Sequence, residues 1–235
     1  AAHALAVAED RVFLKVRERQ KGKSQYERQG REGFWLEIGE HGLLFLVNLT
    51  DYIDTGLFLD HRELRRRTAD WAKGKRVLNL FSYTGTFTCY AAAGRAKSTT
   101  SVDLSNTYTD WARKNLELNG FVGPEHELVT EDVLSFLQEI RGKRHWDLII
   151  LDPPTFSNSK KMEWNLDIQR DHPKLIRMCR ELLDKNGTLI FSTNKKGFRL
   201  NREKLPPFTI KDVTKMTMPR DFQSTGIHKV WTMRR

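Results

Sequence analysis

Residues 77–87 read VLNLFSYTGTF, and this stretch decides the fold class. An apolar run ends at a polar turn, and a helix of small residues is expected to begin at Thr84. In α/β proteins the backbone N–H groups at such a helix start face a ligand at the carboxyl end of the sheet. Gly85 is the single glycine of the turn, whereas a turn that binds a pyrophosphate has the pattern GxGxxG. The stretch predicts a site for a nucleoside cofactor without phosphates; the alternative is a tight turn without a ligand.

Helices and strands alternate around this turn, from residue 61 onward. Strands are expected at residues 76–80, 98–103, 127–130, 146–151 and 188–193, and helices at 61–72, 84–94, 106–119, 133–141 and 167–184. This alternation predicts a parallel sheet with crossover helices. The runs 208–216 and 227–233 have no crossover helix between them, so they should pair antiparallel. The predicted fold is α/β and Rossmann-like, similar to the seven-stranded, mostly parallel sheet of class I methyltransferases with its C-terminal antiparallel hairpin.

Composition narrows the function classes. Lys and Arg number 40 against 30 Asp and Glu, so the formal net charge is +10, which indicates a polyanionic partner. Two cysteines without a CxxC pattern exclude a disulfide scaffold and a cysteine-rich zinc site, and seven scattered histidines predict no metal site. The apolar runs are too short for a membrane span, so we expect a cytoplasmic protein. The missing initial Met suggests a piece excised from a longer chain.

The first 55 residues differ from the remainder. We expect a small, basic, β-rich subdomain over residues 1–55 and a methyltransferase-like domain over residues 56–235. Short β-type runs lie at residues 12–16, 34–38 and 43–47, and residues 39–42 should form a four-residue hairpin connection. A basic stretch with the composition of an exposed loop lies between the first two runs. The RNA contacts expected from this loop are Arg19, Lys21, Lys23 and Arg28.

Acidic residues follow three consecutive strands. Asp103, in the run Asp103-Leu104-Ser105, can accept hydrogen bonds from both ribose hydroxyls of a nucleoside. Asp132 can accept a hydrogen bond from an adenine amino group. The alternative for either residue is a helix N-cap.

The run Asp152-Pro153-Pro154-Thr155-Phe156 directly follows the third of these strands. Two prolines fix φ twice, so the loop is stiff and suits the positioning of a substrate beside the cofactor. A base inserted there could stack on Phe156, and such stacking contributes roughly 1–3 kcal/mol per base in single-strand binders. The alternative is a Pro-Pro turn with Phe156 in the core.

Together these motifs resemble those of bacterial S-adenosylmethionine-dependent ribosomal RNA methyltransferases. The resemblance rests on residues 55–62 (TGLFLDHR), 79–85 (NLFSYTG), 102–105 (VDLS), 152–156 (DPPTF) and 194–198 (NKKGF). Within that group the chain is most similar to the C-terminal half of the bifunctional large-subunit (23S) enzymes, the half that makes N7-methylguanine. The N-terminal half of those enzymes carries an RNA-binding module and an N2-guanine methyltransferase. The resemblance therefore implies a ribosomal RNA substrate and a covalently linked partner domain.

The resemblance also implies where S-adenosylmethionine binds. Asp103 would contact the ribose and Asp132 the adenine, while Asp60 and Arg62 would meet the amino and carboxylate groups of the methionine part. The implied cofactor contacts are Asp60, Arg62, Phe81, Ser82, Tyr83, Thr84, Gly85, Asp103, Leu104, Ser105 and Asp132. The alternative for Arg62 is the start of a helix surface on which Arg65, Arg66 and Arg67 form a solvated or RNA-facing stripe.

The residues at positions 155 and 194 distinguish between the base atoms that the enzyme could methylate. Methylation at C5 of a pyrimidine needs a nucleophile, which such families supply as Cys after strands four and five; Thr155 and Asn194 stand there instead. Enzymes that methylate exocyclic amines place an aromatic residue directly after the second proline, where this chain has Thr155. Guanine N7 carries a lone pair and no proton, so it needs no general base, only positioning and tolerance of the positive charge. These positions disfavour 5-methylcytosine and weaken, without excluding, an N6-methyladenine product, and the resemblance implies an N7-methylguanine product.

The expected catalytic residues are Asp152, Pro153, Pro154, Phe156 and Asn194, with Thr155 and Lys195 as further candidates for base contacts and Lys195, Lys196 and Arg199 as RNA contacts. The alternatives are methylation of another ribosomal RNA base atom, an NAD-linked oxidoreductase or a non-catalytic RNA-binding module. The single Gly85 and the Pro-Pro loop disfavour the oxidoreductase. An RNA-binding module leaves the acids at the strand ends unexplained.

Overall fold

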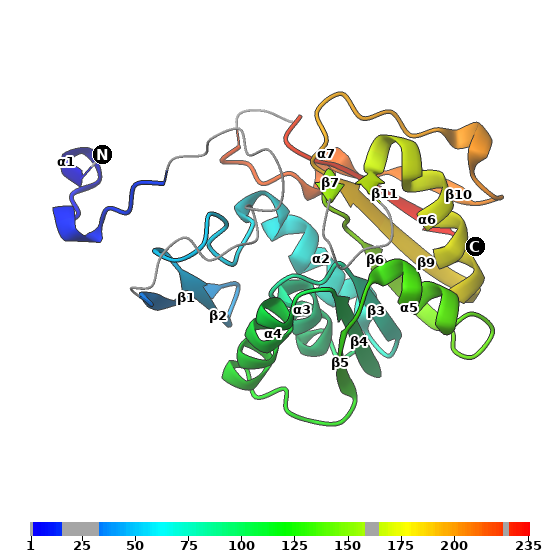
Figure 1. Ribbon diagram of the computed structural model, residues 1–235, viewed down its shortest axis with the longest axis horizontal. Helices are drawn as coiled ribbons and strands as arrows, with labels where there is room; N and C mark the ends of the chain where they lie inside the picture. The colour runs from blue at the N-terminus through cyan, green and yellow to red at the C-terminus, as the bar shows by residue number, and fades with distance from the viewer. Residues whose placement is uncertain (1, 16–32, 158–164, 223–225) are drawn as a thin grey trace.

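The computed structural model describes residues 2–15, 33–157, 165–222 and 226–235. Its centre is a seven-stranded sheet with the order β10-β11-β9-β6-β3-β4-β5 (Figure 1). The strands are β3 (Arg76–Leu80), β4 (Ser98–Asp103), β5 (His126–Thr130), β6 (Trp146–Leu151), β9 (Leu183–Thr193), β10 (Thr209–Asp212) and β11 (Lys229–Arg234). The first five run parallel, whereas β11 pairs antiparallel with both β9 and β10. The predicted fold class is confirmed.

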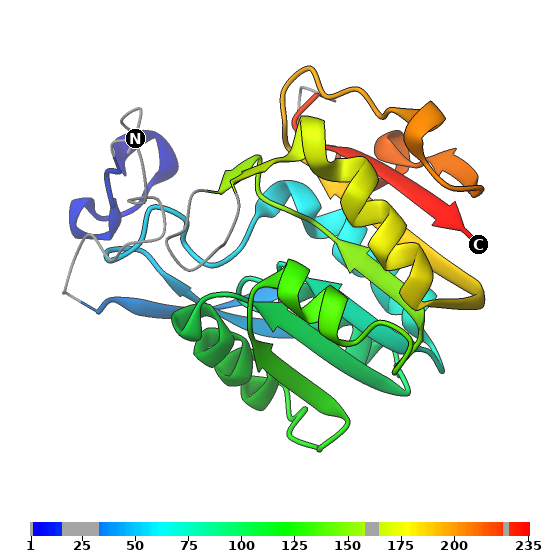
Figure 2. The same cartoon turned by 45° about the vertical axis from the view of Figure 1, so that its right-hand side comes forward.

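Helices cover both faces of this sheet; in Figure 2 the yellow α6 and the green α5 lie in front of it. The long helices are α2 (Arg62–Ala72), α3 (Thr86–Ala93), α4 (Asn106–Leu118), α5 (Val133–Glu139) and α6 (Ile168–Leu182). The short helical elements are α1 (Ala2–Leu5), η1 (Glu9–Arg11), η3 (Leu59–His61), η4 (Arg202–Lys204) and α7 (Thr214–Thr217). Within the described ranges, no helix has the length and apolar character that a bilayer crossing requires.

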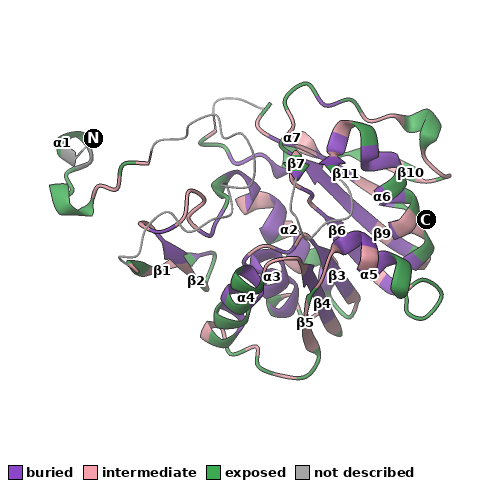
Figure 3. Ribbon diagram, in the orientation of Figure 1, coloured by how far each residue is buried: buried purple, intermediate pink, exposed green. Residues whose placement is uncertain are grey.

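Successive residues of the central strands point to opposite faces of the sheet. Leu78 and Ile149 pack in the cluster that includes α5 and α6, whereas Val77, Leu148 and Ile150 pack with α2 and α3. Both faces of the central strands are therefore buried, as the purple strands in Figure 3 show. Burial on both sides explains why these strands are nearly continuous apolar runs in the sequence.

An N-terminal hairpin of β1 (Trp35–Glu40) and β2 (Leu43–Asn48) packs on the helices of the main sheet. Phe45 and Val47 share a hydrophobic cluster with Cys89 and Leu116 from α3 and α4. The hairpin is thus part of the same packed body as the sheet. The division of the chain at residue 55 stays a prediction.

Three local expectations were wrong. The hairpin turn has two residues, His41 and Gly42, with φ of 49° and 83°, because strand pairing continues to Glu40 and Leu43 and a two-residue turn needs positive φ at both positions. Residues 12–15 form no strand. Among the described residues, the strands of each sheet pair with one another and not with this run. The run 208–216 divides into β10 and α7, because the Asp212 side chain accepts a hydrogen bond from the Thr214 N–H at 2.9 Å and turns the chain.

Candidate active site

The turn after β3 has an unusual backbone conformation. Phe81, Tyr83 and Gly85 have φ of 58°, 50° and 71°, in the left-handed region that bulky residues seldom adopt. A Cβ at Gly85 would lie 2.7 Å from the Cβ of Ala112, so glycine is also required for the close approach of α4. Such strain persists only where the surrounding structure enforces it, and it is typical of ligand-binding turns.

Hydrogen bonds from two directions hold this turn at the carboxyl edge of the sheet. The Ser82 N–H donates to the Val102 carbonyl at 3.0 Å, which joins the turn to β4. The Thr84 hydroxyl donates to the Gly56 carbonyl at 2.7 Å, which joins it to the segment before α2. The predicted cofactor residues 81–85 therefore lie between β4 and the segment 55–61.

Asp103 lies at the end of β4 and contacts the turn directly. Its Oδ2 accepts a hydrogen bond from the Tyr83 N–H at 2.9 Å, and its Oδ1 accepts one from the Ser105 N–H at 3.0 Å. Burial raises the pKa of the Asp103 carboxyl to about 6, although the N–H donors of Ser105 and Tyr83 oppose the shift. A carboxylate has about four acceptor positions, so the backbone donors of Tyr83, Leu104 and Ser105 leave acceptor capacity for a ribose hydroxyl. Asp103 therefore fits the predicted ribose ligand.

Of Asp103 and Asp132, only Asp132 is a helix N-cap. Asp132 is the N-cap of α5, because its Oδ1 accepts hydrogen bonds from the N–H groups of Leu134 and Ser135 at 3.0 and 3.1 Å. A contact with adenine would therefore use the other oxygen, Oδ2. The N-cap of α4 is Ser105 rather than Asp103.

The loop after β6 is fixed at its first residue. Asp152 Oδ1 accepts a hydrogen bond from the Ser192 hydroxyl of β9 at 2.5 Å. Pro153 is buried and Pro154 half-buried, so the stiff segment is held against the sheet edge. The Asp152 side chain itself is 20% exposed, which leaves it accessible to a substrate.

Phe156 lies beyond the prolines and is 52% exposed, so the alternative of a core residue is wrong. It belongs to β7 (Phe156–Ser157), which pairs with β8 (Leu166–Asp167). The Lys195 ammonium lies 4.4 Å from the centroid of the Phe156 ring and 3.8 Å from the Asp167 carboxylate. An exposed aromatic ring with a cation over it, at the same edge as Asp152, is suited to stacking a base.

A buried polar cluster that the sequence analysis missed lies behind this loop. The Oδ2 of Asp60 accepts hydrogen bonds from His228 Nδ1 and Asn194 Nδ2, each at 3.0 Å, and lies 3.5 Å from His61 Nδ1. Burial would raise the pKa of Asp60, but the hydrogen bonds from His228 and Asn194 and the charges of nearby histidines lower it to about 2. Asp60 and both histidines have ligand-type atoms within 4.8 Å of one another. Their separation along the chain hides this grouping from any search for metal-ligand spacing.

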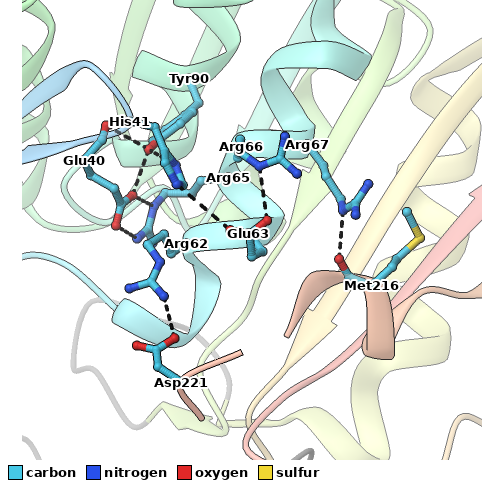
Figure 4. Close-up of polar contacts among 10 residues, drawn as sticks. All are labelled: Glu40, His41, Arg62, Glu63, Arg65, Arg66, Arg67, Tyr90, Met216 and Asp221. Atoms are coloured by element: carbon cyan, nitrogen blue, oxygen red, sulfur yellow. Dashed lines mark hydrogen bonds and ion pairs between the residues drawn. The ribbon is translucent and has the colours of Figure 1, made fainter. Parts of the chain in front are cut away.

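The structure gives Asp60 and Arg62 different partners. Asp60 is buried in the cluster just described, whereas the Arg62 guanidinium pairs with Asp221 at 2.5 Å (Figure 4). Asp60 Oδ2 already accepts hydrogen bonds from His228 and Asn194, so a contact with the cofactor amino group would use Oδ1. A shared contact of Asp60 and Arg62 with the methionine part stays a prediction, and it would require Arg62 to leave Asp221.

The predicted arginine stripe on α2 is wrong for Arg65, which is 1% exposed. Its guanidinium donates two hydrogen bonds of 2.8 Å to the Glu40 carboxylate (Figure 4). It donates a third, of 2.7 Å, to the Phe58 carbonyl. The Tyr90 hydroxyl donates to the same carboxylate at 3.0 Å. The helix turns by 100° per residue, so Arg65 faces inward while Arg66 remains on the surface.

The predicted RNA contacts fall into two groups. Arg19, Lys21, Lys23 and Arg28 lie outside the described residues. In the segment after β9, Lys196 and Arg199 are exposed and Lys195 is half-buried beside Phe156. Lys195 therefore contacts the candidate base-binding loop, and Lys196 and Arg199 follow it as exposed cationic side chains.

Together these residues form a candidate active site at the carboxyl edge of β3, β4, β6 and β9. The turn 81–85 and Asp103 can hold a nucleoside cofactor, while Asp152, Thr155 and Phe156 can hold a base beside it. Sequence reasoning missed His61, Ser192 and His228. Only His61 had a signal, since it lies within the run TGLFLDHR at residues 55–62.

Comparisons with known proteins agree with this site. Residues 1–211 match a family model described as S-adenosylmethionine-dependent methyltransferase. A solved methyltransferase structure complexed with SAH superposes with a TM-score of 0.76 at 32% identity, over 88% of this chain and 57% of the other. The bound SAH of that structure is the demethylated form of the expected cofactor.

Two curated relatives cover nearly all of this chain. The ribosomal RNA large subunit methyltransferase K/L of Allochromatium vinosum is 53% identical over 230 residues, which are 97% of this chain and 31% of that protein. The ribosomal RNA large subunit methyltransferase K of Neisseria meningitidis is 51% identical over 228 residues, which are 97% of this chain and 64% of that protein. The chain thus spans less than two thirds of the length of either relative. The resemblance seen in the sequence motifs is confirmed.

Proposed function

Because this chain belongs to the family of S-adenosylmethionine-dependent methyltransferases, we propose that it methylates guanine N7 in large-subunit ribosomal RNA. The names of the two curated relatives support an RNA of the large ribosomal subunit as the substrate. The observation that carries the choice of atom is the set of side chains at the ends of β6 and β9. It comprises the Asp152 carboxylate, the Thr155 hydroxyl and the Asn194 amide, without a thiol.

The two cysteines are unsuited to nucleophilic catalysis. Cys89 lies in α3 and Cys179 in α6, and both are fully buried. Burial raises the pKa of the Cys89 thiol to about 12 and also raises that of Cys179, so neither forms a thiolate at neutral pH. This supports a reaction in which the base itself is the nucleophile.

The cofactor supplies a methyl group activated by a sulfonium centre. In the proposed reaction the lone pair of guanine N7 attacks the methyl carbon. The N7–C bond forms as the C–S bond breaks, the electron pair of the broken bond stays on sulfur, and the base becomes cationic. No proton is transferred, so this chain contributes positioning and electrostatic stabilisation.

Asp152 is suited to stabilise the cationic base. Positive charge that develops at N7 spreads to the N1–H and the amino group of guanine. Hydrogen bonds from these groups to a carboxylate strengthen as the charge develops, so they favour the transition state over the bound substrate. The hydrogen bond from Ser192 fixes Asp152 Oδ1 and leaves Oδ2 for the base.

Recognition of guanine O6 needs hydrogen-bond donors. Asn194 already donates its Nδ2 to Asp60, so the Thr155 hydroxyl and the Lys195 ammonium are the better candidates. Phe156 would stack on the base face, and Lys196 and Arg199 would contact neighbouring phosphates. A ribosomal RNA substrate would place the enzyme in the bacterial cytoplasm. A second, linked RNA-binding and methyltransferase half is consistent with the greater length of the relatives.

Product analysis tests the proposal. The protein is incubated with labelled S-adenosylmethionine and ribosomal RNA from a strain that lacks the modification, and the labelled nucleoside is identified by mass spectrometry. We expect 7-methylguanosine in large-subunit RNA. Label in 5-methylcytidine, N6-methyladenosine or N2-methylguanosine instead would overturn the assignment of the atom, and label in small-subunit RNA alone would overturn the substrate.

A further inference from the structure

His61 is a buried histidine whose ring nitrogens both lack a hydrogen bond within the described part of the chain. The residue is 2% exposed, at the end of η3. Buried polar groups are nearly always paired, and an unpaired one costs about 1–3 kcal/mol. Because His61 lies beside the candidate active site and its burial lowers stability, its presence there suggests a functional role.

His61 lies between two carboxylates that come from different parts of the chain. Its Nδ1 is 3.5 Å from Asp60 Oδ2, and its Nε2 is 3.8 Å from Asp152 Oδ1. Its ring stacks on that of His228, with centroids 4.8 Å apart and planes inclined by 14°, and contacts the edge of Phe87. The charged or titratable groups that face it are Asp60, Asp152, His228 and Arg65.

The two carboxylates differ in how many donors they already have. Asp60 Oδ2 accepts hydrogen bonds from His228 and Asn194, while Asp152 Oδ1 accepts one from Ser192. Asp152 therefore has the greater need of a further donor. Its distance from His61 Nε2 exceeds an ordinary hydrogen bond by about 0.8 Å, and such bonds often tighten only when the substrate is bound.

We propose that His61 is a positioning residue for Asp152, donating its Nε2–H to Oδ1 so that Oδ2 points to the base. The inference rests on the proposed role of Asp152 in the methyl transfer. His61 itself touches neither base nor cofactor in this assignment. Its stack on His228 and the contact with Phe87 fix the ring plane, so the donor direction is set by the residue before β11 and by α3 as well as by η3.

Two substitutions separate positioning from packing. In His61→Gln the amide nitrogen lies near the place of Nε2, so the donor to Asp152 is retained. In His61→Asn the amide nitrogen reaches only as far as Nδ1, so that donor is lost. A misplaced catalytic group costs up to about 100-fold in rate, so we expect kcat to fall roughly 10- to 100-fold in His61→Asn and to be largely kept in His61→Gln. KM for RNA and the affinity for the cofactor should change less than about threefold in both variants.

The matched control is His172→Asn. His172 is also fully buried, but its Nδ1 contacts the Ile168 carbonyl at 3.0 Å and its Nε2 accepts from the Asn201 N–H at 3.0 Å. Its replacement should lower the free energy of unfolding without lowering kcat. Equal losses of kcat in His61→Asn and His61→Gln, or no loss in either, would overturn the proposal.

A second measurement does not depend on the RNA substrate. In protein labelled with ¹⁵N-histidine and saturated with S-adenosylhomocysteine, NMR reports which ring nitrogen of His61 carries a proton. We expect a protonated Nε2 whose resonance moves in Asp152→Asn while those of His172 stay in place. An unprotonated Nε2, or a resonance unaffected by Asp152→Asn, would overturn the proposal. If wild-type protein fails to make 7-methylguanosine but the NMR result holds, the proposed function fails while the contact between His61 and Asp152 stands.

Discussion

At the scale of single residues, the site combines one carboxylate with a raised pKa and another with a lowered pKa. Burial raises the pKa of Asp103 to about 6, whereas hydrogen bonds from His228 and Asn194 outweigh burial at Asp60 and lower its pKa to about 2. Asp60 is therefore ionised throughout the physiological range and structural in character. Asp103 changes charge near pH 6, which makes it sensitive to its ligand.

The affinity for S-adenosylmethionine should fall as the pH decreases through about 6. As the proposed ribose ligand, the ionised form of Asp103 would accept from both ribose hydroxyls, and protonation, complete well below the raised pKa, removes an acceptor and the charge. Isothermal titration between pH 5 and 8 measures this dependence. Asp103→Asn should bind roughly 10- to 100-fold more weakly at pH 7.5, because hydrogen bonds to charged groups contribute about 1.5–3 kcal/mol, and its affinity should not vary between pH 5 and 8. An equal pH dependence in wild type and Asp103→Asn would contradict the assignment.

The double substitution Cys89→Ala with Cys179→Ala should leave kcat within about twofold of wild type. Both thiols are buried and protonated, so neither attacks a base. The free energy of unfolding should fall by about 1 kcal/mol for each substitution, as for other small truncations in a core. Activity is measured below the melting temperature of the variant. Complete loss of methyl transfer by a folded double variant would reinstate a cysteine mechanism.

At the scale of elements, the Arg65 side chain of helix α2 connects the N-terminal hairpin with the segment that precedes η3. Arg65 pairs with Glu40 at the end of β1 and donates to the Phe58 carbonyl in the segment that precedes η3. The same segment supplies the Gly56 carbonyl that receives the hydrogen bond from Thr84. The N-terminal hairpin and the cofactor turn are thus linked through α2 and residues 56–58.

Arg65→Ala should lower the free energy of unfolding by about 3–5 kcal/mol, because it leaves the buried Glu40 carboxylate without its ion pair. Urea denaturation measures the loss. The control is Arg66→Ala on the same helix, whose ion pair with Glu63 is exposed and contributes at most about 1 kcal/mol. In a double variant with Glu40→Gln the loss should be smaller than the sum of the single losses. Similar small losses at Arg65 and Arg66 would show that the buried pair is not structural.

At the scale of the whole molecule, the net charge of +10 is unevenly arranged around the site. The carboxylates Asp103 and Asp152 lie at the strand ends, while Lys195, Lys196 and Arg199 follow β9 on the solvent side. RNA phosphates are repelled from the first group and attracted to the second. For the proposed RNA substrate, this arrangement favours a backbone path over the segment after β9, with the target base entering toward Asp152.

Lys196→Ala with Arg199→Ala should weaken RNA binding and reduce its salt dependence. Removing one contact between a cationic side chain and a phosphate lowers the slope of log affinity against log salt by roughly 0.7–0.9. Filter binding at several salt concentrations measures the slope, and titration with S-adenosylmethionine should give an unchanged affinity. The control Arg141→Ala with Lys143→Ala removes two exposed charges near the start of β6, at the opposite edge of the sheet. An equal decrease of slope in both double variants would contradict a defined RNA path.

The local errors of the sequence-based predictions have a common cause. The alternative of a surface stripe included Arg65 because the run Arg65-Arg66-Arg67 is uniformly charged, yet the partner that buries Arg65 is Glu40 on another element. The buried surroundings of Asp60 were not predicted, because His228 lies 168 positions along the chain and reaches it only in the folded state. Local pattern assigns an element and a face, but the partner of a polar side chain depends on contacts between elements.

The sequence by itself determined the seven-stranded sheet and the edge that carries the site, because apolar periodicity and turn residues act over short distances along the chain. It also determined the cofactor class, since the turn 81–85 and Asp103 follow their strands directly. Only the tertiary structure decided which carboxylate is buried among hydrogen-bond donors and which stays accessible to a substrate. Residues 152 and 194 follow the parallel strands β6 and β9, while residue 60 in η3 and residue 228 before the antiparallel β11 reach the same edge. The burial and hydrogen bonds found there fix the environment of each carboxylate.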